Sequence, residues 1–385
     1  MNLNWVKRRG RDFDYYIIPV LVIISVISTL AIYSITRNRQ GMEDWYIREI
    51  IWQIASYGLM FVFVALDYSI LKNRIARISY YIGLLSLVIV FVFPASHGAH
   101  SWITLPGLQL QPSEFTKIFM ILFIADYGAK QKELGNRFGW RQFGVMLAAV
   151  LVPALLILKQ PALGQALVML AIFFCMLVVM LEKKQFYVLL AASFVFVLAV
   201  VLAMDVFPDR SMHFLNSLPL AQHQKERFVT FLNPEADPTG AGFQVHEAEI
   251  AIGSGGLLGQ GFLKGSQTQG NWVPEQWTDF IFSAIGEEFG YVGSSGVILL
   301  FFLLIYRMVR IAVSTEDYFA VLFMAGAIGM FGFQVFENIG MNLAIMPVAG
   351  ITLPFISYGG SSLLTNFVVI GISLSIGIRR RKLAF

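Results

Sequence analysis

Long apolar runs separated by polar segments dominate the pattern of this 385-residue chain. A membrane-spanning helix needs about 20 mostly apolar residues, whereas the strands of a β-barrel would alternate polar and apolar positions. Ten apolar runs are present, centred at 15–35, 48–67, 78–94, 113–128, 143–158, 163–181, 186–206, 279–305, 318–338 and 353–378. The pattern predicts an all-α polytopic membrane protein of about ten transmembrane helices, forming a single integral membrane domain over 1–385.

The composition agrees with this class. Hydrophobic residues make up 57% of the chain and charged residues only 14%, against about 25% charged in soluble domains. The first run follows a basic segment, 7–11, and precedes no small-residue cleavage signal, so we expect a first spanning helix and not a cleaved signal peptide. The single cysteine, Cys175, excludes a disulfide within one chain and is expected to be a packing residue.

The basic residues of the connections predict the orientation. They fall mainly on the side of the N-terminus, which places both termini in the cytoplasm. The net charge of +4 largely reflects this bias and indicates no nucleic-acid partner. The longest connection, 207–277, then becomes a large extracytoplasmic loop between helices 7 and 8. Long loops in compact proteins are usually functional or disordered.

Asp279 stands where this long connection turns into the eighth apolar run. A carboxylate inside a bilayer costs roughly 2.5–3.5 kcal/mol or more, so it is rarely kept without a partner or a task. The simpler interpretation is a helix-start carboxylate favoured by the helix dipole. Glu287 and Glu288 follow in the same run. Three carboxylates on one spanning helix indicate that part of it faces a polar interior.

Two further groups of charges are candidates for binding an anion. Glu114 and Lys117 are spaced i,i+3 at the start of the fourth run, and so share a helix face. They form either a structural ion pair or a cation held toward an anionic substrate group. Lys225 and Arg227 in the long loop are either solvated charges or a clamp for phosphate.

The glycine-rich segment 253–261 lacks the Gly-Lys-Ser/Thr of a P-loop, which favours tight turns. Segment 354–362 contains Ser357 and opens the tenth run. Its small residues allow close helix packing, and its backbone amides also suit an anion. The sequence shows no dedicated metal cage, so no metal ligand is assigned. A divalent cation, Mg or Mn, is left open.

Several motifs resemble those of the SEDS family (shape, elongation, division and sporulation). They are Gln111-Pro112-Ser113-Glu114 with Lys117, Asn233-Pro234-Glu235-Ala236-Asp237-Pro238, Ala251-Ile252-Gly253-Ser254-Gly255-Gly256, Pro274-Glu275, Thr278-Asp279-Phe280-Ile281-Phe282, Gly286-Glu287-Glu288, Leu353-Pro354 and Ser357-Tyr358-Gly359-Gly360-Ser361. The resemblance implies a ten-helix protein of the bacterial cytoplasmic membrane that polymerises lipid II into peptidoglycan glycan strands at its outer face. Segments 13–15 and 265–269 look most like the family's elongation member.

The resemblance also implies roles for single residues. Asp279 resembles the family's essential aspartate and becomes the candidate general base for the acceptor 4-hydroxyl, in an inverting displacement that releases undecaprenyl pyrophosphate. Lys117 and Arg227 are candidates for stabilising the pyrophosphate. Glu114, Ser357 and Glu287 are further substrate-binding candidates. The implied partners are a class B penicillin-binding protein, which is a transpeptidase, and other membrane proteins of the elongation complex.

Two positions depart from the family pattern. Ala162 stands where the family usually has Asp in Pro-Asp-Leu-Gly, and Trp277 stands where it often has His before Thr-Asp. The second departure argues against a general acid-base histidine. Two other functions stay open. One is a flippase for lipid-linked sugars, and the other is a non-catalytic scaffold for the penicillin-binding protein.

Overall fold

The structure is a computed structural model that describes residues 13–94, 101–105, 108–136, 138–206, 225, 227, 230–231 and 240–379. The motif 233–238 lies outside the described residues. Within the described part, ten long helices coincide one by one with the ten predicted apolar runs, which confirms the all-α polytopic fold. They are α2 (Ile17–Thr36), α3 (Trp45–Ala65), α4 (Arg74–Ile89), α5 (Pro112–Glu133), α6 (Trp140–Lys159), α7 (Leu163–Met180), α8 (Lys183–Val206), α13 (Ile281–Val313), α14 (Tyr318–Asn342) and α15 (Gly360–Arg379).

Short elements complete the described chain. The 3-10 helices η1 (Tyr68–Leu71) and η2 (Val90–Val92) flank α4, and the strands β1 (Ile103–Leu105) and β2 (Leu108–Leu110) form an antiparallel hairpin before α5. The long connection before α13 contains α11 (Ala241–Ser254) and α12 (Ser266–Gln269). Eight of the ten long helices are long and apolar enough to cross a membrane, judged by length and composition alone. The chain is thus a multi-pass membrane protein.

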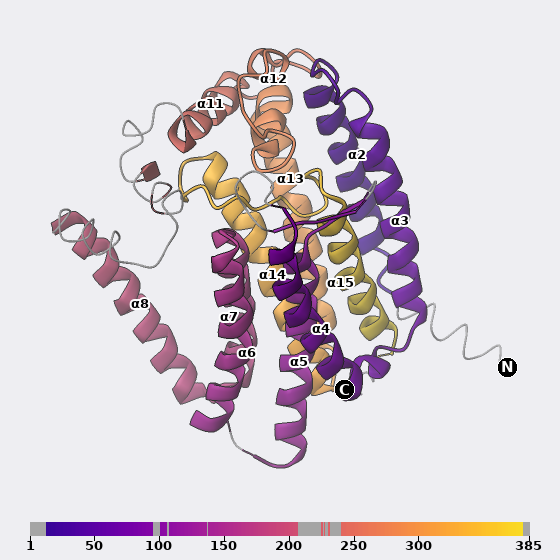
Figure 1. The fold of residues 1–385 in the computed structure, drawn as a ribbon, viewed down its shortest axis with the longest axis vertical. Coiled ribbons are helices and arrows are strands. Elements are labelled where there is room, and N and C mark those ends of the chain that lie inside the picture. The colour runs from indigo at the N-terminus through magenta and orange to yellow at the C-terminus, as the bar shows by residue number, and fades with distance from the viewer. Residues whose placement is uncertain are drawn as a thin grey trace.

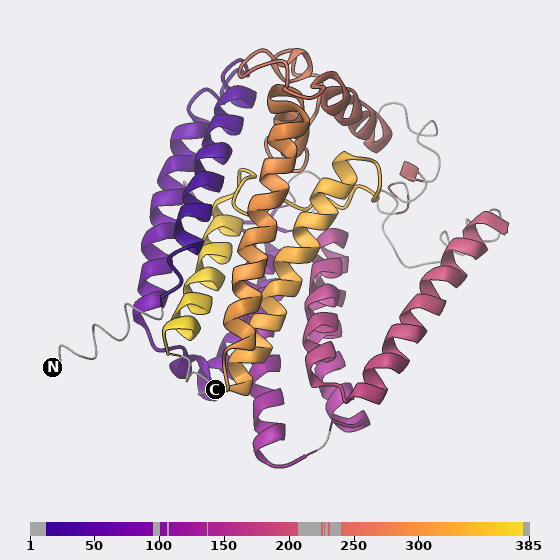
Figure 2. The same cartoon turned by 180° about the vertical axis from the view of Figure 1, so that it is seen from behind.

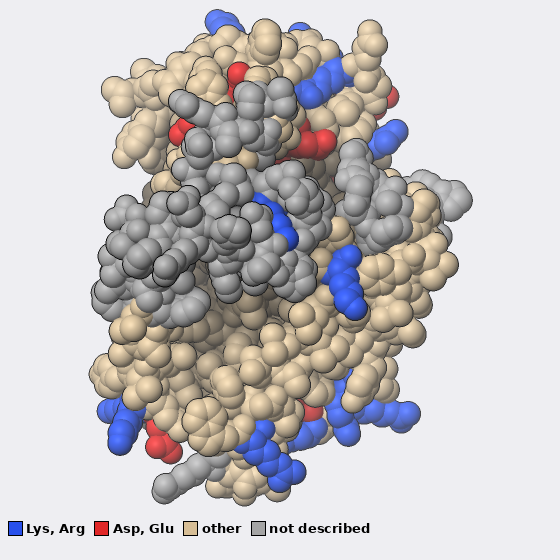
Figure 3. Space-filling model, turned by 60° about the vertical axis from the view of Figure 1, so that its left-hand side comes forward, with Lys and Arg blue, Asp and Glu red and all other residues tan. Residues whose placement is uncertain are grey.

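The helices form a bundle with two distinct ends (Figures 1 and 2). Helices α11 and α12 lie at one end, which we call the loop end, whereas α8 leans away from the bundle. On the face shown in Figure 3, Lys and Arg side chains gather at the opposite end and also occur at the loop end, and the described surface between the two ends carries few charges. This distribution is typical of a bundle that is charged where it meets water and apolar where it meets lipid.

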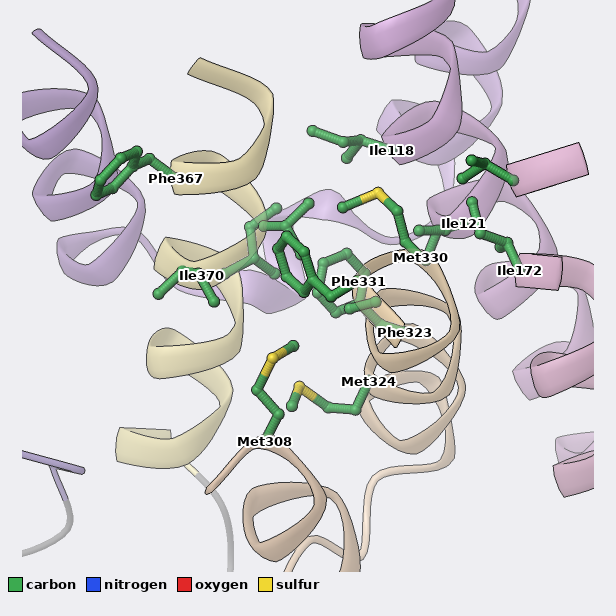
Figure 4. Close-up of a cluster of buried hydrophobic side chains, with 14 of the residues drawn as sticks. Ile118, Ile121, Ile172, Met308, Phe323, Met324, Met330, Phe331, Phe367 and Ile370 are labelled. Carbon is green, nitrogen blue, oxygen red and sulfur yellow. The ribbon is translucent and has the colours of Figure 1, made fainter. Parts of the chain in front are cut away.

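Helix α14 lies at the centre of the apolar core. Its Met330 and Phe331 join Ile118 and Ile121 of α5 and Phe367 of α15 in one buried cluster (Figure 4). Small residues bring α14 close to its neighbours. A β-carbon at Gly326 would come within 2.9 Å of Ile121, and one at Gly329 within 2.8 Å of Cys175. Cys175 therefore acts as a packing residue against α14, where small residues allow close approach.

The glycine-rich segment supports a break in α13. Gly290 has φ 64° and ψ −162°, which interrupts the helix. Part of the freed backbone is satisfied from the glycine-rich segment: the Tyr291 amide donates to the Gly256 carbonyl at 2.9 Å, and the Gln260 amide to the Glu287 carbonyl at 2.9 Å. A β-carbon at Gly259 would lie 2.1 Å from the Glu288 carbonyl oxygen. The segment makes tight turns against a broken helix, as predicted, because only glycine allows this approach.

Candidate active site

Asp279 lies in a tight turn just before α13. The amides of Thr278, Asp279 and Phe280 all point to the carbonyl oxygen of Glu275, at 3.1, 3.1 and 3.4 Å. Glu275 itself has a positive φ of 48°, which is uncommon for a residue with a side chain. The Asp279 side chain is partly buried, whereas Phe280 and Ile281 are fully buried. The turn thus presents the carboxylate at the boundary between the long connection and the bundle.

Two asparagines of α14 hold the backbone of Asp279. The side-chain amides of Asn338 and Asn342 both donate to the Asp279 carbonyl oxygen, at 2.8 and 3.1 Å. Asn338 also donates to the Ile351 carbonyl at 2.7 Å. Both asparagines are fully buried. Because these bonds join the turn to a rigid helix and to the segment after it, the position of the carboxylate is well defined.

The segment between α14 and α15 holds the other residues of the turn. The Ser357 hydroxyl donates to the Thr278 carbonyl at 2.5 Å and accepts from the Leu353 amide at 2.8 Å. The Tyr358 amide donates to the Trp277 carbonyl at 2.9 Å. These contacts give Ser357 a positioning role beside Asp279. Its role as a substrate ligand stays a prediction.

Arg227 and Asp279 meet at Gly350. A β-carbon at Gly350 would lie 3.2 Å from Arg227 Nη1 and 3.6 Å from Asp279 Oδ2. Arg227 Nη1 also donates to the Val348 carbonyl at 3.2 Å. Burial raises the pKa of Asp279 to about 6, against the opposing effect of the Arg227 charge and with a further increase from Glu275. A carboxyl group in this range accepts a proton near neutral pH more readily than an ordinary aspartate does.

Glu114 and Lys117 form an ion pair, as one of the two interpretations expected. Glu114 Oε2 and Lys117 Nζ are 2.9 Å apart, with side chains 1% and 0% exposed. Gln165 Nε2 of α7 donates to the other carboxylate oxygen at 2.7 Å. Within the described part of the chain, Lys117 Nζ has no hydrogen-bond acceptor in suitable geometry. The buried ammonium therefore has unused donor capacity.

The first turn of α7 connects the two charged groups. Gly164 packs so closely against the segment after α14 that a β-carbon there would lie 2.5 Å from the Ala349 carbonyl oxygen and 2.4 Å from the Ile351 side chain. Those two residues flank Gly350, and the next residue of α7 is Gln165, which binds Glu114. The first turn of α7 thus contacts both the segment that carries Gly350 and the Glu114–Lys117 pair.

Glu287 occupies a different environment. Its carboxylate accepts from the amides of Gln267 and Thr268 at 2.6 and 2.9 Å, and from the hydroxyls of Thr268 and Ser266 at 2.7 and 3.3 Å. The Glu287 carboxylate therefore attaches the first residues of α12 to helix α13. These contacts support a structural role, and substrate binding by Glu287 stays a prediction.

Sequence reasoning missed four residues around Asp279: Glu275 as a neighbouring charge, Gly350 as the contact between charges, and the two asparagines of α14. Asn338 and Asn342 carried a usable signal, since two amides spaced i,i+4 in an apolar run rarely persist without partners. Gly350 carried none, because its importance depends on which side chains the fold brings to it. Among the residues that the structure describes, no group of three or more His, Cys, Asp or Glu could hold a metal ion.

Fold and site together define a polytopic membrane protein with a carboxylate and a guanidinium held at one end of a ten-helix bundle. The family profile FtsW/RodA/SpoVE, described as "Cell cycle protein", matches residues 13–382. The chain belongs to this family, which is the SEDS family that its motifs resemble.

Similar proteins cover nearly the whole chain. The probable peptidoglycan glycosyltransferase FtsW of Geobacter metallireducens is 32% identical, covering 99% of each chain. The peptidoglycan glycosyltransferase RodA of Treponema pallidum is also 32% identical, covering 96% of this chain and 98% of its own. A solved structure titled "Structural coordination of polymerization and crosslinking by a peptidoglycan synthase complex" superposes with TM-score 0.76 at 28% identity, covering 95% of this chain and 97% of that chain.

Proposed function

We propose that this protein polymerises lipid II into glycan strands, with Asp279 as the general base. The chain is a peptidoglycan glycosyltransferase of the bacterial cytoplasmic membrane, as its family membership and relatives of both the FtsW and RodA types indicate. The observation that carries the mechanistic proposal is that Arg227 and Asp279, a carboxyl group whose pKa is raised to about 6, approach the same glycine, Gly350. The Asp279 carboxylate suits proton removal, and the Arg227 guanidinium suits the binding of an anion.

The proposed step is a single displacement. Asp279 removes the proton from the 4-hydroxyl of the acceptor N-acetylglucosamine as that oxygen attacks C1 of the donor N-acetylmuramic acid. The bond from C1 to the pyrophosphate oxygen breaks, its electron pair leaves with undecaprenyl pyrophosphate, and C1 inverts. Only one carboxylate has to act in such a reaction path, and a positioned base contributes typically 10²–10⁴-fold.

Two cations are available for the departing pyrophosphate. Arg227 presents a planar fork beside Asp279, and such a fork suits phosphate oxygens. Lys117 is fully buried near the first turn of α7, and its ammonium retains unused N–H donors. Cations fixed where negative charge develops stabilise a transition state without reorganisation. We assign Arg227 to the pyrophosphate directly and Lys117, oriented by Glu114, to a second contact with the substrate.

The wider setting follows from the family. We propose that the loop end faces the outside of the cell, where lipid II would meet Asp279, and that 207–277 forms an extracytoplasmic loop within the single membrane domain. The partner would be a class B penicillin-binding protein, supported by the similarity to a chain from a complex whose title couples polymerization to crosslinking. Segments 13–15 and 265–269 favour use in cell elongation together with other membrane proteins of that process.

The test is polymerisation of lipid II by the purified protein with its transpeptidase partner, measured as glycan chain length, for the parent and Asp279→Asn. We expect long glycans from the parent and none from the variant, with equal folding and equal partner binding. Glu316→Gln at the opposite end of the bundle serves as the control, because it removes an exposed carboxylate far from the site in sequence. An active Asp279→Asn enzyme would remove Asp279 as the base.

Two other outcomes would favour other functions. Lipid II translocation in vesicles without polymerisation by the parent would favour the flippase. A stable complex with the partner that has no activity in either form would favour the scaffold, and would make Ala162 the next position to examine.

A further inference from the structure

Arg39 is a charged residue at the loop end that the proposed reaction does not use. It lies in the connection between α2 and α3, far from Asp279 in sequence. Its Nη2 donates to the Val273 carbonyl at 3.1 Å, and its guanidinium carbon lies 4.7 Å from the centroid of the Trp277 ring. Arg39 therefore binds both ends of the segment 273–277, two residues before the candidate base.

The first residue of α3, Trp45, also contacts Trp277. The Trp45 ring meets the Trp277 ring edge-on at 5.9 Å and stacks on Tyr358 at 4.7 Å. Tyr358 in turn donates its backbone amide to the Trp277 carbonyl. Trp277 thus contacts both Arg39 and Trp45.

The charge of Arg39 also acts on this segment. Burial lowers the pKa of Arg39 while the nearby Glu275 raises it, so the two charges sense one another. Glu275 is the same residue that raises the pKa of Asp279. Glu275 therefore acts electrostatically on both Arg39 and Asp279, and Arg227 acts on Asp279 as well.

We propose that Arg39 is a positioning residue of the glycosyltransferase site: it fixes the turn through Trp277 and Val273, and its charge partly offsets that of Glu275, which acts on Asp279. This inference rests on the proposed role of Asp279. Among the described residues, the charges that act on Asp279 are Arg227 from 225–231 and Glu275 from its own turn, while α14 contributes only the amides of Asn338 and Asn342. The neighbouring titratable group of the α14–α15 segment, Tyr358, interacts with Arg48 and Glu49.

The test uses the acid limb of the pH–rate profile of lipid II polymerisation, with the full-length protein and its transpeptidase partner. In Arg39→Gln, the charge of Glu275 is no longer partly offset, so it opposes ionisation of Asp279 more strongly. We expect the acid limb to move up by roughly 0.5–1 pH unit. Arg39→Lys keeps the charge and loses the planar stack, so its limb should stay near that of the parent while kcat falls. Arg37 is an exposed charged residue at the start of the same connection, so Arg37→Gln should change neither the acid limb nor kcat.

The double variant Arg39→Gln/Glu275→Gln decides whether Glu275 is the intermediary. Removing both charges should return the acid limb to the pH at which the parent shows it, or to a lower pH. If Arg39→Gln alone has no measurable activity, the double variant should recover part of it. An Arg39→Gln limb that does not move, a limb that moves equally in Arg37→Gln, or a double variant that restores neither limb nor activity overturns the inference.

Failure of this inference can be distinguished from failure of the proposed function. If Asp279→Asn is inactive and the Arg39 variants leave the acid limb unmoved, Asp279 remains the base and Arg39 is only a structural residue. If Asp279→Asn is active, the acid limb belongs to another group and both proposals fail.

Discussion

The side chains of Arg227 and Asp279 approach the same glycine, Gly350, from segments more than fifty residues apart in sequence. A β-carbon at Gly350 would lie 3.2 Å from Nη1 of the arginine and 3.6 Å from Oδ2 of the aspartate. The close approach depends on the absence of a side chain there and on the positive φ of 70° that glycine adopts freely. The candidate site therefore places a carboxylate and a guanidinium against the same glycine.

The first prediction concerns pH. The pKa of Asp279 is raised to about 6, and only the ionised form can act as a base. Activity should therefore be full above this value and fall by about tenfold per pH unit below it. Arg227 lowers this pKa, so Arg227→Gln should move the acid limb upward as well as reduce kcat. The profile should be recorded between about pH 4.5 and 8 with folding monitored in parallel. An acid limb near pH 4 in the parent would contradict the burial of the catalytic carboxylate.

The second prediction concerns Gly350. In Gly350→Ala the new methyl group crowds Arg227 and the residue must keep a positive φ, which costs about 1–2 kcal/mol. We expect a modest loss of thermal stability and a much larger loss of polymerisation, because the guanidinium is displaced from Asp279. Gly332→Ala in α14 is the matched control, since its β-carbon would meet nothing within 4 Å. Equal activity in both variants would show that the spacing at Gly350 is unimportant.

The third prediction separates the two interpretations of Glu114 and Lys117. Removing one member of a buried ion pair typically destabilises by about 3–5 kcal/mol, whereas replacing both is often tolerated. The double variant Glu114→Gln/Lys117→Met should therefore fold. If Lys117 contacts the substrate, polymerisation by this variant should still fall by about 100-fold or more. Thermal unfolding and glycan yield measured together decide the matter: a stable variant with parental yield would leave only the structural ion pair.

The fourth prediction concerns Ala162, the N-cap of α7, whose side chain makes no capping hydrogen bond. In Ala162→Asp the carboxylate could accept from the free amides of the first turn, which should stabilise the protein by about 0.5–2 kcal/mol. Ala162→Asn should cap in the same way without adding charge. Thermal unfolding of both variants measures how much the cap contributes to stability. A difference between their polymerisation rates would reveal an effect of the added charge. If neither variant is stabilised, the first turn of α7 does not need a cap.

Much of this protein follows from the sequence by itself. Ten apolar runs became ten helices because backbone groups in lipid must bond within their own segment, so hydropathy and length nearly determine the secondary structure. Asp279, Glu114 and Lys117 stood out for the same reason: a charge in or beside an apolar run is costly and needs an explanation. Arg227 was a candidate for a different reason, because an arginine fork in the long loop suits phosphate. The family motifs then indicated the class of reaction.

Only the tertiary structure decided how these residues combine. Burial and Glu275 raise the pKa of Asp279 against the opposing effect of Arg227, and Asn338 and Asn342 fix its position. Glu287 holds the start of α12 through contacts that its place in the sequence did not indicate. Sequence spacing cannot supply such relationships, because pKa values and hydrogen bonds depend on distances between segments that are brought together only when the helices pack.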